Sequence, residues 1–282
     1  MLRRANIGYW ILILTNKKQT YKNSYQQVKK VNYSGIWYID SLLNDQEGKG
    51  KPIKWKSDPT YKKNKGTNKT VITYSFAKKK SKFKYKDELG NNIQVTAFSK
   101  KSQKNIKKAF KKISSFLNIQ FIEVDEKDGE CGSIRIGMKE ITDEEGNYLP
   151  GIAATGSIPG KSPENGDIWF NTWFKNQLFK TGLDPNSETG CGDLHVMYHE
   201  ILHTLGLEHP NDNKKIKFKK NKNFKEFTVM AAEFLNGDDG SKFNDYSSEQ
   251  HTNYTVGSAP MVYDIAALQH LYGSNKKYNK KN

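Results

Sequence analysis

Cysteine is scarce in this sequence, which has only Cys131 and Cys191 among its 282 residues. Two cysteines are too few for a disulfide framework, so the chain is not a small scaffold held together by disulfide bonds. Its length is instead sufficient to bury a hydrophobic core. The two cysteines could form one bridge if the protein is exported, or they could remain free thiols, and the sequence leaves both alternatives open.

Arginine is nearly absent too, occurring only as Arg3, Arg4 and Arg135, although the formal net charge is +16. Almost all of the positive charge is therefore lysine, a hydrated point charge without the planar fork of donors that arginine uses to recognise bases and phosphates. The lysines are spread from Lys17 to Lys281, as on a solvated surface. We expect no nucleic-acid partner, and only a general attraction to acidic surfaces or substrates.

Long apolar segments are also missing, and none approaches the roughly 20 residues of a membrane-spanning helix. The apolar run Ile7–Leu14 is short and follows Arg3 and Arg4. This charged start is typical of a secretory signal, but the polar residues after it offer no small-residue cleavage site. A buried strand or part of a pro-segment are the alternatives. We assign residues 1–33 to an N-terminal extension and residues 34–282 to one domain, and we expect no stable membrane insertion.

Regular secondary structure is indicated by hydrophobic periodicity in the middle of the chain. Between Lys101 and Leu117, apolar residues recur at intervals of three and four while lysines fill the remaining face, which predicts an amphipathic helix packed on a core. Further predicted elements are strands at Thr70–Phe76, Ile119–Val124, Ser133–Met138 and Gly166–Asn171, a short apolar element at Ile36–Leu43, and a helix at Met261–Leu271 ending at Gly273. Polar stretches at residues 15–33, 44–68, 210–226 and 234–258 are expected to be irregular.

A histidine-rich motif follows the last of the predicted strands. It has the pattern H-E-x-x-H-x-x-G-x-x-H, formed by His199, Glu200, His203, Gly206 and His209. On a helix, His199 and His203 project from the same face about one turn apart, close enough to bind one ion. Gly206 should end the helix at positive φ, so that the chain turns and His209 reaches the same ion. Three imidazoles leave one tetrahedral position for water, as in catalytic zinc sites, so the sequence predicts one Zn²⁺.

Two residues at the start of this helix have other predicted roles. Asp193 could cap the helix N-terminus. His195 is not expected to be a ligand, because it lies eight residues before His203, about 12 Å along a helix axis, and these two could not share one ion.

Glu200 is the candidate catalytic residue because it lies beside the first predicted ligand. A bound zinc lowers the pKa of its water and polarises a carbonyl group. A neighbouring carboxylate can then take the proton of the water and pass it to a leaving amine. These residue types therefore indicate metal-assisted hydrolysis of peptide bonds.

The extended motif resembles that of the metzincin zinc endopeptidases, and the residues around it are similar to the serralysin branch. Phe227–Glu233 matches the position of the Met-turn, with Met230 as a hydrophobic floor beneath the metal, and Ala259–Gly273 is similar to the C-terminal helix of the family. The resemblance covers about Ser34 to Asn275. It implies an α/β (α+β) fold with a twisted, mixed five-stranded sheet, an active-site helix beneath it, an irregular lower subdomain and a C-terminal helix.

The same resemblance implies how substrates bind. In the family, the segment corresponding to Gly151–Ser157 is an edge strand, antiparallel to its neighbour, that pairs with the substrate backbone. Ala153 and Ala154 would then lie near the substrate. The resemblance further implies protein or peptide substrates, a monomer and an extracellular location. Serralysins usually continue into glycine-aspartate nonapeptide repeats that bind calcium; this sequence contains no such repeat, so calcium is not expected.

One position departs from the serralysin pattern. The family typically has a tyrosine two residues after the Met-turn methionine, and this sequence has Ala232. The main hypothesis is therefore a zinc endopeptidase with a plainer site of three histidines and water. The alternative is a zinc-bound, catalytically weak homologue that serves as a protein-binding module. A third hypothesis, a basic surface-binding protein, rests on charge alone.

Overall fold

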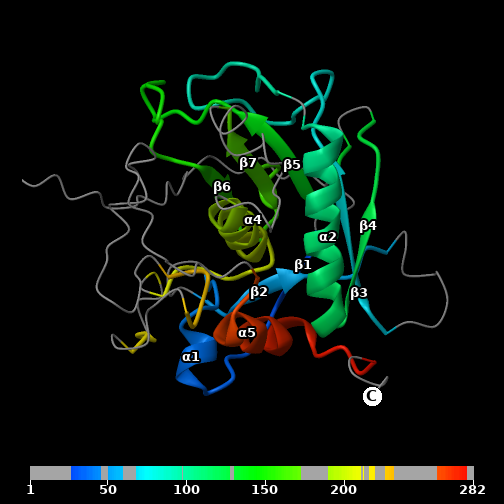
Figure 1. Cartoon of the computed structure of the whole chain (residues 1–282), viewed down its shortest axis with the longest axis vertical. Helices are drawn as coiled ribbons and strands as arrows, with labels where there is room; N and C mark the ends of the chain where they lie inside the picture. The colour runs from blue at the N-terminus through cyan, green and yellow to red at the C-terminus, as the bar shows by residue number, and fades with distance from the viewer. Residues whose placement is uncertain are drawn as a thin grey trace, which may run out of the picture.

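The central feature of the computed structural model is a mixed five-stranded sheet with the order β4-β3-β5-β7-β6 (Figure 1). Four strands are parallel to one another: β3 (Thr70–Phe76), β4 (Ile119–Glu123), β5 (Ile134–Lys139) and β7 (Asp167–Asn171). The edge strand β6 (Ala154–Gly156) runs antiparallel to β7. The predicted fold class and the predicted strands are confirmed.

The structure describes residues 27–45, 50–59, 68–96, 98–127, 130–172, 190–210, 212, 216–219, 226–231 and 259–277, without the side chains of residues 190–193. The predictions for the apolar run Ile7–Leu14, for Ala232 and for residues 234–258 lie outside this part of the chain, as does the side chain of Cys191. Cys131 is buried and is a free cysteine.

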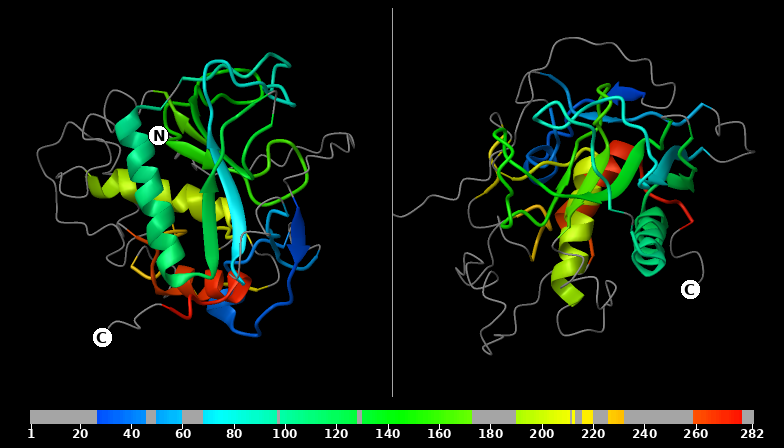
Figure 2. Two further views of the ribbon diagram at one scale, coloured as in Figure 1. Left: turned by 90° about the vertical axis from the view of Figure 1, so that its right-hand side faces the viewer. Right: turned by 90° about the horizontal axis from the view of Figure 1, so that it is seen from above.

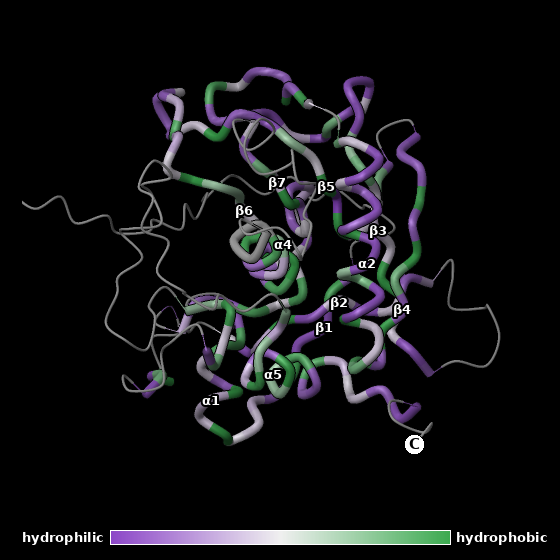
Figure 3. Tube along the Cα trace, viewed as in Figure 1, coloured by the Kyte–Doolittle hydropathy of each residue, from purple (hydrophilic) through white to green (hydrophobic). Residues whose placement is uncertain are grey.

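Two helices pack against one face of the sheet, α2 (Lys100–Phe116) and α4 (Gly190–Thr204) (Figure 2). Helix α2 begins where the Ser99 side chain accepts a hydrogen bond from the Ser102 amide. Its apolar stripe meets the sheet at Phe110, whose ring lies 4.6 Å from that of Tyr74 and 4.4 Å from that of Phe121. Figure 3 shows hydrophilic residues along much of α2, in agreement with the predicted lysine face.

Helix α4 begins earlier than the sequence suggested. Its first residue is Gly190, so Asp193 lies inside the first turn and does not occupy the N-cap position that we predicted. The apolar residues at the centre of α4 are buried under the sheet, among them Met197, Ile201 and Leu202. Burial of this side fixes the rotation of the helix about its axis, and thereby the direction in which its histidines point.

The opposite face of the sheet is covered by the segment that follows β3. Ile93 and Ala77 form a second small core with Trp169 of β7, and the Phe83 ring packs 5.7 Å from Trp169. Arg135 of β5 is buried beneath this segment, where its Nε donates to Glu126 Oε1 at 2.9 Å. The sheet is thus covered on both faces, as expected for a largely parallel sheet.

Four short elements lie below the sheet: β1 (Val28–Lys30), α1 (Trp37–Asp40), β2 (Ile53–Trp55) and the C-terminal helix α5 (Val262–Tyr272). Helices α1 and α5 pack together (Figure 1). The strands β1 and β2 lie in stretches that we expected to be irregular, so that prediction was wrong there. β1 pairs with β2 although it falls within the predicted extension, and the boundary at residue 33 stays a prediction.

No helix in the described ranges combines the length and the apolar character that crossing a membrane requires.

Candidate metal centre

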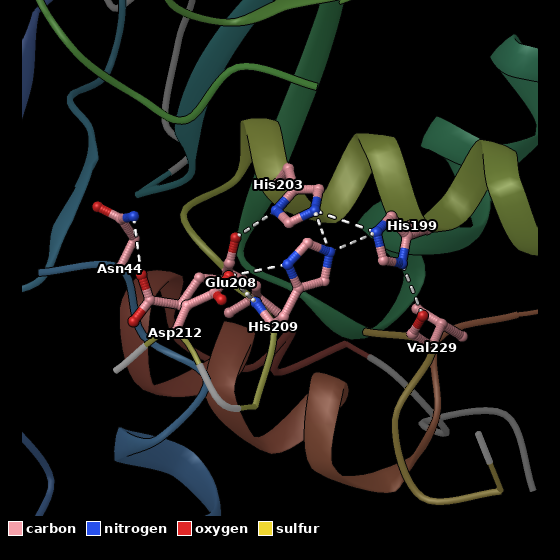
Figure 4. A network of polar contacts seen from close by, with 8 residues as sticks. Asn44, His199, His203, Glu208, His209, Asp212 and Val229 are labelled. Carbon is pink, nitrogen blue, oxygen red and sulfur yellow. Dashed lines mark hydrogen bonds and ion pairs between the residues drawn. The ribbon is translucent and has the colours of Figure 1, made fainter. Parts of the chain in front are cut away.

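Three imidazole rings converge beneath the sheet (Figure 4). His199 and His203 come from α4, and their Nε2 atoms lie 3.1 Å apart. His209 comes from the loop after α4, and its Nε2 lies 3.1 Å from that of His199 and 3.3 Å from that of His203. In the part of the chain that the structure describes, this is the only group of three or more His, Cys, Asp or Glu residues close enough to hold a metal ion.

The other nitrogen of each ring has a partner of its own. His199 Nδ1 lies 2.8 Å from Val229 O, and His203 Nδ1 lies 2.9 Å from Leu207 O. His209 Nδ1 lies 2.8 Å from a carboxylate oxygen of Asp212. Because these oxygens only accept, each Nδ1 must carry the proton, and each neutral ring then has a lone pair at Nε2.

The arrangement fits a zinc ion. Three lone pairs that face one another at 3.1–3.3 Å repel and cannot form hydrogen bonds among themselves. A cation between them removes this repulsion. Tetrahedral zinc with Zn–N distances of about 2.0–2.1 Å would hold its nitrogens about 3.3 Å apart, close to the separations observed here. The rings are therefore spaced and protonated as zinc ligands require.

The pKa values of His199 and His203, the two histidines of α4, also suit metal binding. Burial, followed by the neighbouring His203 and His209, holds the pKa of His199 well below its ordinary value. Burial and the same His209 lower the pKa of His203 to about 3. Both rings therefore stay neutral in the folded protein, and neutral imidazole is the form that binds metal.

The loop that carries His209 begins at Gly206, which has φ +105°. A Cβ at this position would lie 2.7 Å from Ile53 O, so both the backbone conformation and the space favour glycine. The helix therefore ends where the sequence predicted. Leu207 then forms an isolated antiparallel bridge with Leu43, which brings the N-terminal segment alongside the loop.

Residues far away in the sequence fix this loop by hydrogen bonds. Glu208 N donates to Leu42 O at 2.9 Å, and Asn44 N donates to Gly206 O at 3.0 Å. The Asn44 side chain donates to Glu208 Oε2 at 2.9 Å. From the other side, Trp55 Nε1 donates to Thr204 O at 2.7 Å. The position of the third histidine thus depends on residues 42–44 and on β2.

Glu208 is an unusual neighbour for the metal centre. It is only 5% exposed, and its Oε1 has no hydrogen-bond partner in the described structure. Burial, followed by the nearby carboxylates of Asp212 and Asp45, raises its pKa to about 9.

A turn below the rings contains Met230, which is fully buried. Val229, the residue before it, provides the carbonyl that holds His199. Asp264 of α5 fixes this turn, because its Oδ2 accepts from Val229 N at 2.9 Å and its Oδ1 accepts from the Thr228 hydroxyl. The C-terminal helix is thereby linked to the first histidine through three hydrogen bonds.

Glu200 lies between α4 and the edge strand β6. It is 7% exposed, and burial raises its pKa to about 8. A Cβ at Gly156 of β6 would lie 2.9 Å from Glu200 Oε2 and 2.6 Å from its backbone oxygen. The strand can therefore approach the carboxyl this closely only because residue 156 is glycine.

The two alanines that the sequence placed near a substrate lie in and beside β6. Ala153 O accepts from Asn171 N at 2.9 Å, and Ser157 N donates to Asp167 O at 2.9 Å. Hydrogen-bonded positions alternate along an antiparallel strand, so the N–H and C=O groups of Ala154 and Gly156 point away from β7. Since β6 ends the strand order, these groups face no further strand of the described sheet.

Four supporting residues were missed in the sequence: Asn44, Trp55, Asp212 and Asp264. Asp212 could have been found, because it follows His209 by three residues and carboxylates often orient metal-binding histidines. Asp264 lies inside the C-terminal segment that resembles the family, but its partner could not be named. Asn44 and Trp55 are separated from their partners by more than a hundred residues, and no local pattern marks them. His195, which we excluded as a ligand, is not among the three converging rings.

A mixed sheet above a helix, a glycine turn and a buried methionine turn below three imidazoles together define a metzincin-like catalytic domain. The sequence profile of the matrixin family, peptidase M10, matches residues 65–239. The chain belongs to this metallopeptidase family, and it is serralysin-like within it.

Curated relatives agree with this assignment. A serralysin of Proteus mirabilis is 28% identical over 216 residues, which cover 72% of this chain and 40% of the relative. Serralysin G of Dickeya chrysanthemi is 29% identical over 247 residues, which cover 84% of this chain and 45% of the relative. The chain therefore spans less than half the length of these two proteins.

Proposed function

We propose that this protein is a zinc-dependent metalloendopeptidase that hydrolyses peptide bonds of protein substrates. The observation that carries the proposal is the convergence of three Nε2 atoms whose rings are each held by a separate acceptor at Nδ1. His199, His203 and His209 would hold one zinc ion. When bound, zinc lowers the pKa of a water molecule and polarises the substrate carbonyl.

Glu200 would move the proton. Its carboxylate would take a proton from the attacking water and later deliver it to the leaving amine. The raised pKa of this buried carboxyl suits the delivery of the proton to the leaving amine, because a carboxyl that holds a proton near neutral pH can also release it there. Gly156 leaves the space in which the carboxyl lies.

The outer edge of β6 would bind the substrate backbone. The N–H and C=O groups of Ala154 and Gly156 offer the pattern with which an extended peptide can pair as an additional strand. Ala153 and Ala154 would then lie beside the substrate, as the sequence predicted. Pairing at this edge would lay a peptide next to Glu200, since Gly156 and Glu200 are in contact.

The remaining assignments are also proposals. Gly206 would deliver the third ligand, and Met230 would serve as an apolar floor without binding the ion. We further propose that residues 34–282 form the catalytic domain and residues 1–33 an extension, that the protein acts as a monomer, and that it acts outside the cell as its serralysin relatives suggest. No calcium site and no nucleic-acid partner are proposed.

The test compares the wild type and three variants in casein cleavage and in metal content. The wild type should contain about one zinc per chain and should cleave casein until a chelator is added. Glu200→Gln should keep the zinc while the cleavage rate falls by about 10²–10⁴. His203→Ala should lose both. Glu144→Gln, which removes a carboxylate from an exposed loop, is the control and should behave like the wild type. Cleavage that persists in the chelator would refute the proposal.

The alternative is a zinc-bound homologue that cleaves weakly and acts as a protein-binding module. It is favoured by Ala232, which stands where serralysins typically have a tyrosine. Zinc binding without cleavage, with no change in Glu200→Gln, would support this alternative. A rise in activity in Ala232→Tyr would show instead that the departure reduces an existing peptidase activity. The third hypothesis, a surface-binding protein, still has only the net charge in its favour.

A further inference from the structure

A concave site lies on the side of the molecule formed by β1, β2 and the end of α5, where Figure 1 shows the two strands above the helix. We call it the basic groove. Its volume is about 540 Å³, and it is lined by Lys29, Lys30, Val31, Asn32, Lys51, Lys54, His270 and Leu271. Four of these eight residues are lysines and none is acidic, so the groove concentrates positive charge.

The strand register places two of these lysines directly opposite each other. Lys29 of β1 pairs with Lys54 of β2, and like charges in such cross-strand positions are destabilising. Burial, followed by the charge of Lys29, lowers the pKa of Lys54. None of the four lysines forms an ion pair with a carboxylate in the part of the chain that the structure describes. The groove therefore keeps a repulsion that its described surroundings do not neutralise.

Hydrogen bonds hold two of the ammonium groups in place. Lys51 Nζ donates to Asn32 Oδ1 at 2.7 Å, and Lys54 Nζ donates to Leu271 O. His270 Nε2 lies 2.8 Å from Asn32 O, which fixes the side of α5 against the segment after β1. Each ammonium has three donors, so both lysines keep donors that an anion could use.

The lysines of α2 form a useful contrast. They project from the outer face of a helix, and Lys107 forms an ion pair with Glu123 at 2.7 Å. Such a face is a solvated surface that needs no ligand. In the basic groove the lysines instead surround a concave space, so a single ligand can contact several of them.

We propose that the basic groove binds a compact oxyanion of the phosphate class with two or more negative charges. Lysine binds phosphate as a point charge, and several lysines around one concavity can share a multiply charged group. The volume falls within the range of about 300–1,000 Å³ that is usual for small-ligand sites. The phosphate could be free in solution or esterified in a lipid headgroup, since the same chemistry recognises both.

The first measurement is the melting temperature with inorganic phosphate or with chloride at equal ionic strength. Phosphate should raise the melting temperature of the wild type by about 2–4 °C relative to chloride. Lys29→Gln should lose this rise, and without phosphate it should melt above the wild type because the repulsion from Lys54 is gone. Lys51→Gln, which leaves the Lys29–Lys54 pair intact, should also lose most of the rise.

Lys108→Gln is the matched control, because it removes one positive charge from α2 and leaves the groove unchanged. It should keep the full response to phosphate. Equal responses of Lys29→Gln, Lys108→Gln and the wild type would show that phosphate acts on overall charge or on the metal, and would overturn the proposal.

Vesicles distinguish the two sources of phosphate. If the natural ligand is a lipid headgroup, the wild type and Lys108→Gln should sediment together with phosphatidylcholine vesicles that contain phosphatidic acid. Lys29→Gln should remain in solution. Sedimentation of none of them, together with the stabilisation by inorganic phosphate, would assign a free anion. Equal sedimentation of all three would contradict a specific role for the basic groove.

Discussion

The two sides of the metal centre are built differently. His199 and His203 project from α4, whose backbone hydrogen bonds are local and whose rotation is fixed by its buried apolar side. His209 projects from a loop, and the bonds that position this loop come from residues 42–44 and Trp55. The backbone that carries His199 and His203 is therefore formed within fifteen residues of sequence, whereas the backbone that carries His209 is positioned by contacts across most of the chain.

This difference teaches where the site is most sensitive to change. A helix can lose one contact and keep its course, because its remaining turns hold the same geometry. A loop has no such redundancy, and each of its anchors is a separate contribution to order. We therefore expect single substitutions at the distant anchors to affect the position of His209 more than the course of α4.

The largest effect is expected for Gly206→Ala. Alanine at φ +105° is strained, and its Cβ would lie 2.7 Å from Ile53 O. Strain and overpacking together should cost about 2–4 kcal/mol of unfolding free energy and displace His209, so that zinc is lost. Denaturant unfolding and metal analysis would measure both. Gly90→Ala is the control, since Gly90 has φ +78° with open space around it, and should cost about 1–2 kcal/mol without loss of zinc. Equal effects of the two substitutions would contradict the role of the close approach.

The stability of the metal-free protein in acid tests the histidines that α4 carries. The pKa of His203 is lowered from its ordinary 6.5 to about 3, so between these values the unfolded chain binds a proton that the folded chain does not. The contribution of His203 to the unfolding free energy should therefore fall by about 2–4 kcal/mol from pH 6.5 to pH 4, while the raised pKa values of the buried Glu200 and Glu208 act in the opposite direction. Thermal unfolding in a chelator would measure it. The stability difference between the wild type and His203→Gln should change by this amount across the window, and a difference that does not vary with pH would contradict the prediction.

The same contrast explains what the sequence could predict. The three histidines, Glu200 and Gly206 could be named because their spacing is a property of one helix and one turn. The helix α2 and the strands of the sheet followed from periodicity for the same reason. Each of these patterns is local, so the side chains that form it can be read from neighbouring positions.

The parts that could not be predicted lack a local pattern. β1 and β2 are each only three residues long, so no alternation of sufficient length exists to reveal them. Trp55 gave no sign that its indole would meet the end of α4, because 149 residues separate it from Thr204. The anchors of the loop are tertiary contacts, and only the folded chain displays them.

A smaller effect is expected for Trp55→Phe, which removes one of the hydrogen bonds that anchor the end of α4 and the loop after it. Phenylalanine keeps most of the buried ring but cannot donate to Thr204 O, and a buried carbonyl left without its donor costs about 1–3 kcal/mol. Zinc should dissociate faster, because the end of α4 and the start of the loop lose a shared support. Trp37→Phe is the control, since the indole of Trp37 donates no hydrogen bond in the described structure. Identical zinc dissociation in both variants would show that the loop does not need this anchor.

The smallest effect, about 1.4 kcal/mol or less, is expected for Asp212→Asn, which alters the partner of the third ring. His199 and His203 are held by backbone carbonyls, which no side-chain substitution removes, whereas His209 is held by a carboxylate. Asparagine can still accept from Nδ1 through its carbonyl oxygen, but the negative charge that makes the ring a stronger ligand is gone. Zinc affinity should fall by up to about tenfold at neutral pH, measured by competition with a chelator.

Asp125→Asn controls for the change in net charge, because Asp125 is an exposed residue paired only with Lys78 on the surface. It should leave zinc affinity unchanged. The difference in zinc affinity between the two variants measures how much the charge of Asp212 contributes to binding through His209. If Asp212→Asn binds zinc as tightly as the wild type, the negative charge of Asp212 is not needed, and an uncharged acceptor at Nδ1 is enough to orient the ring.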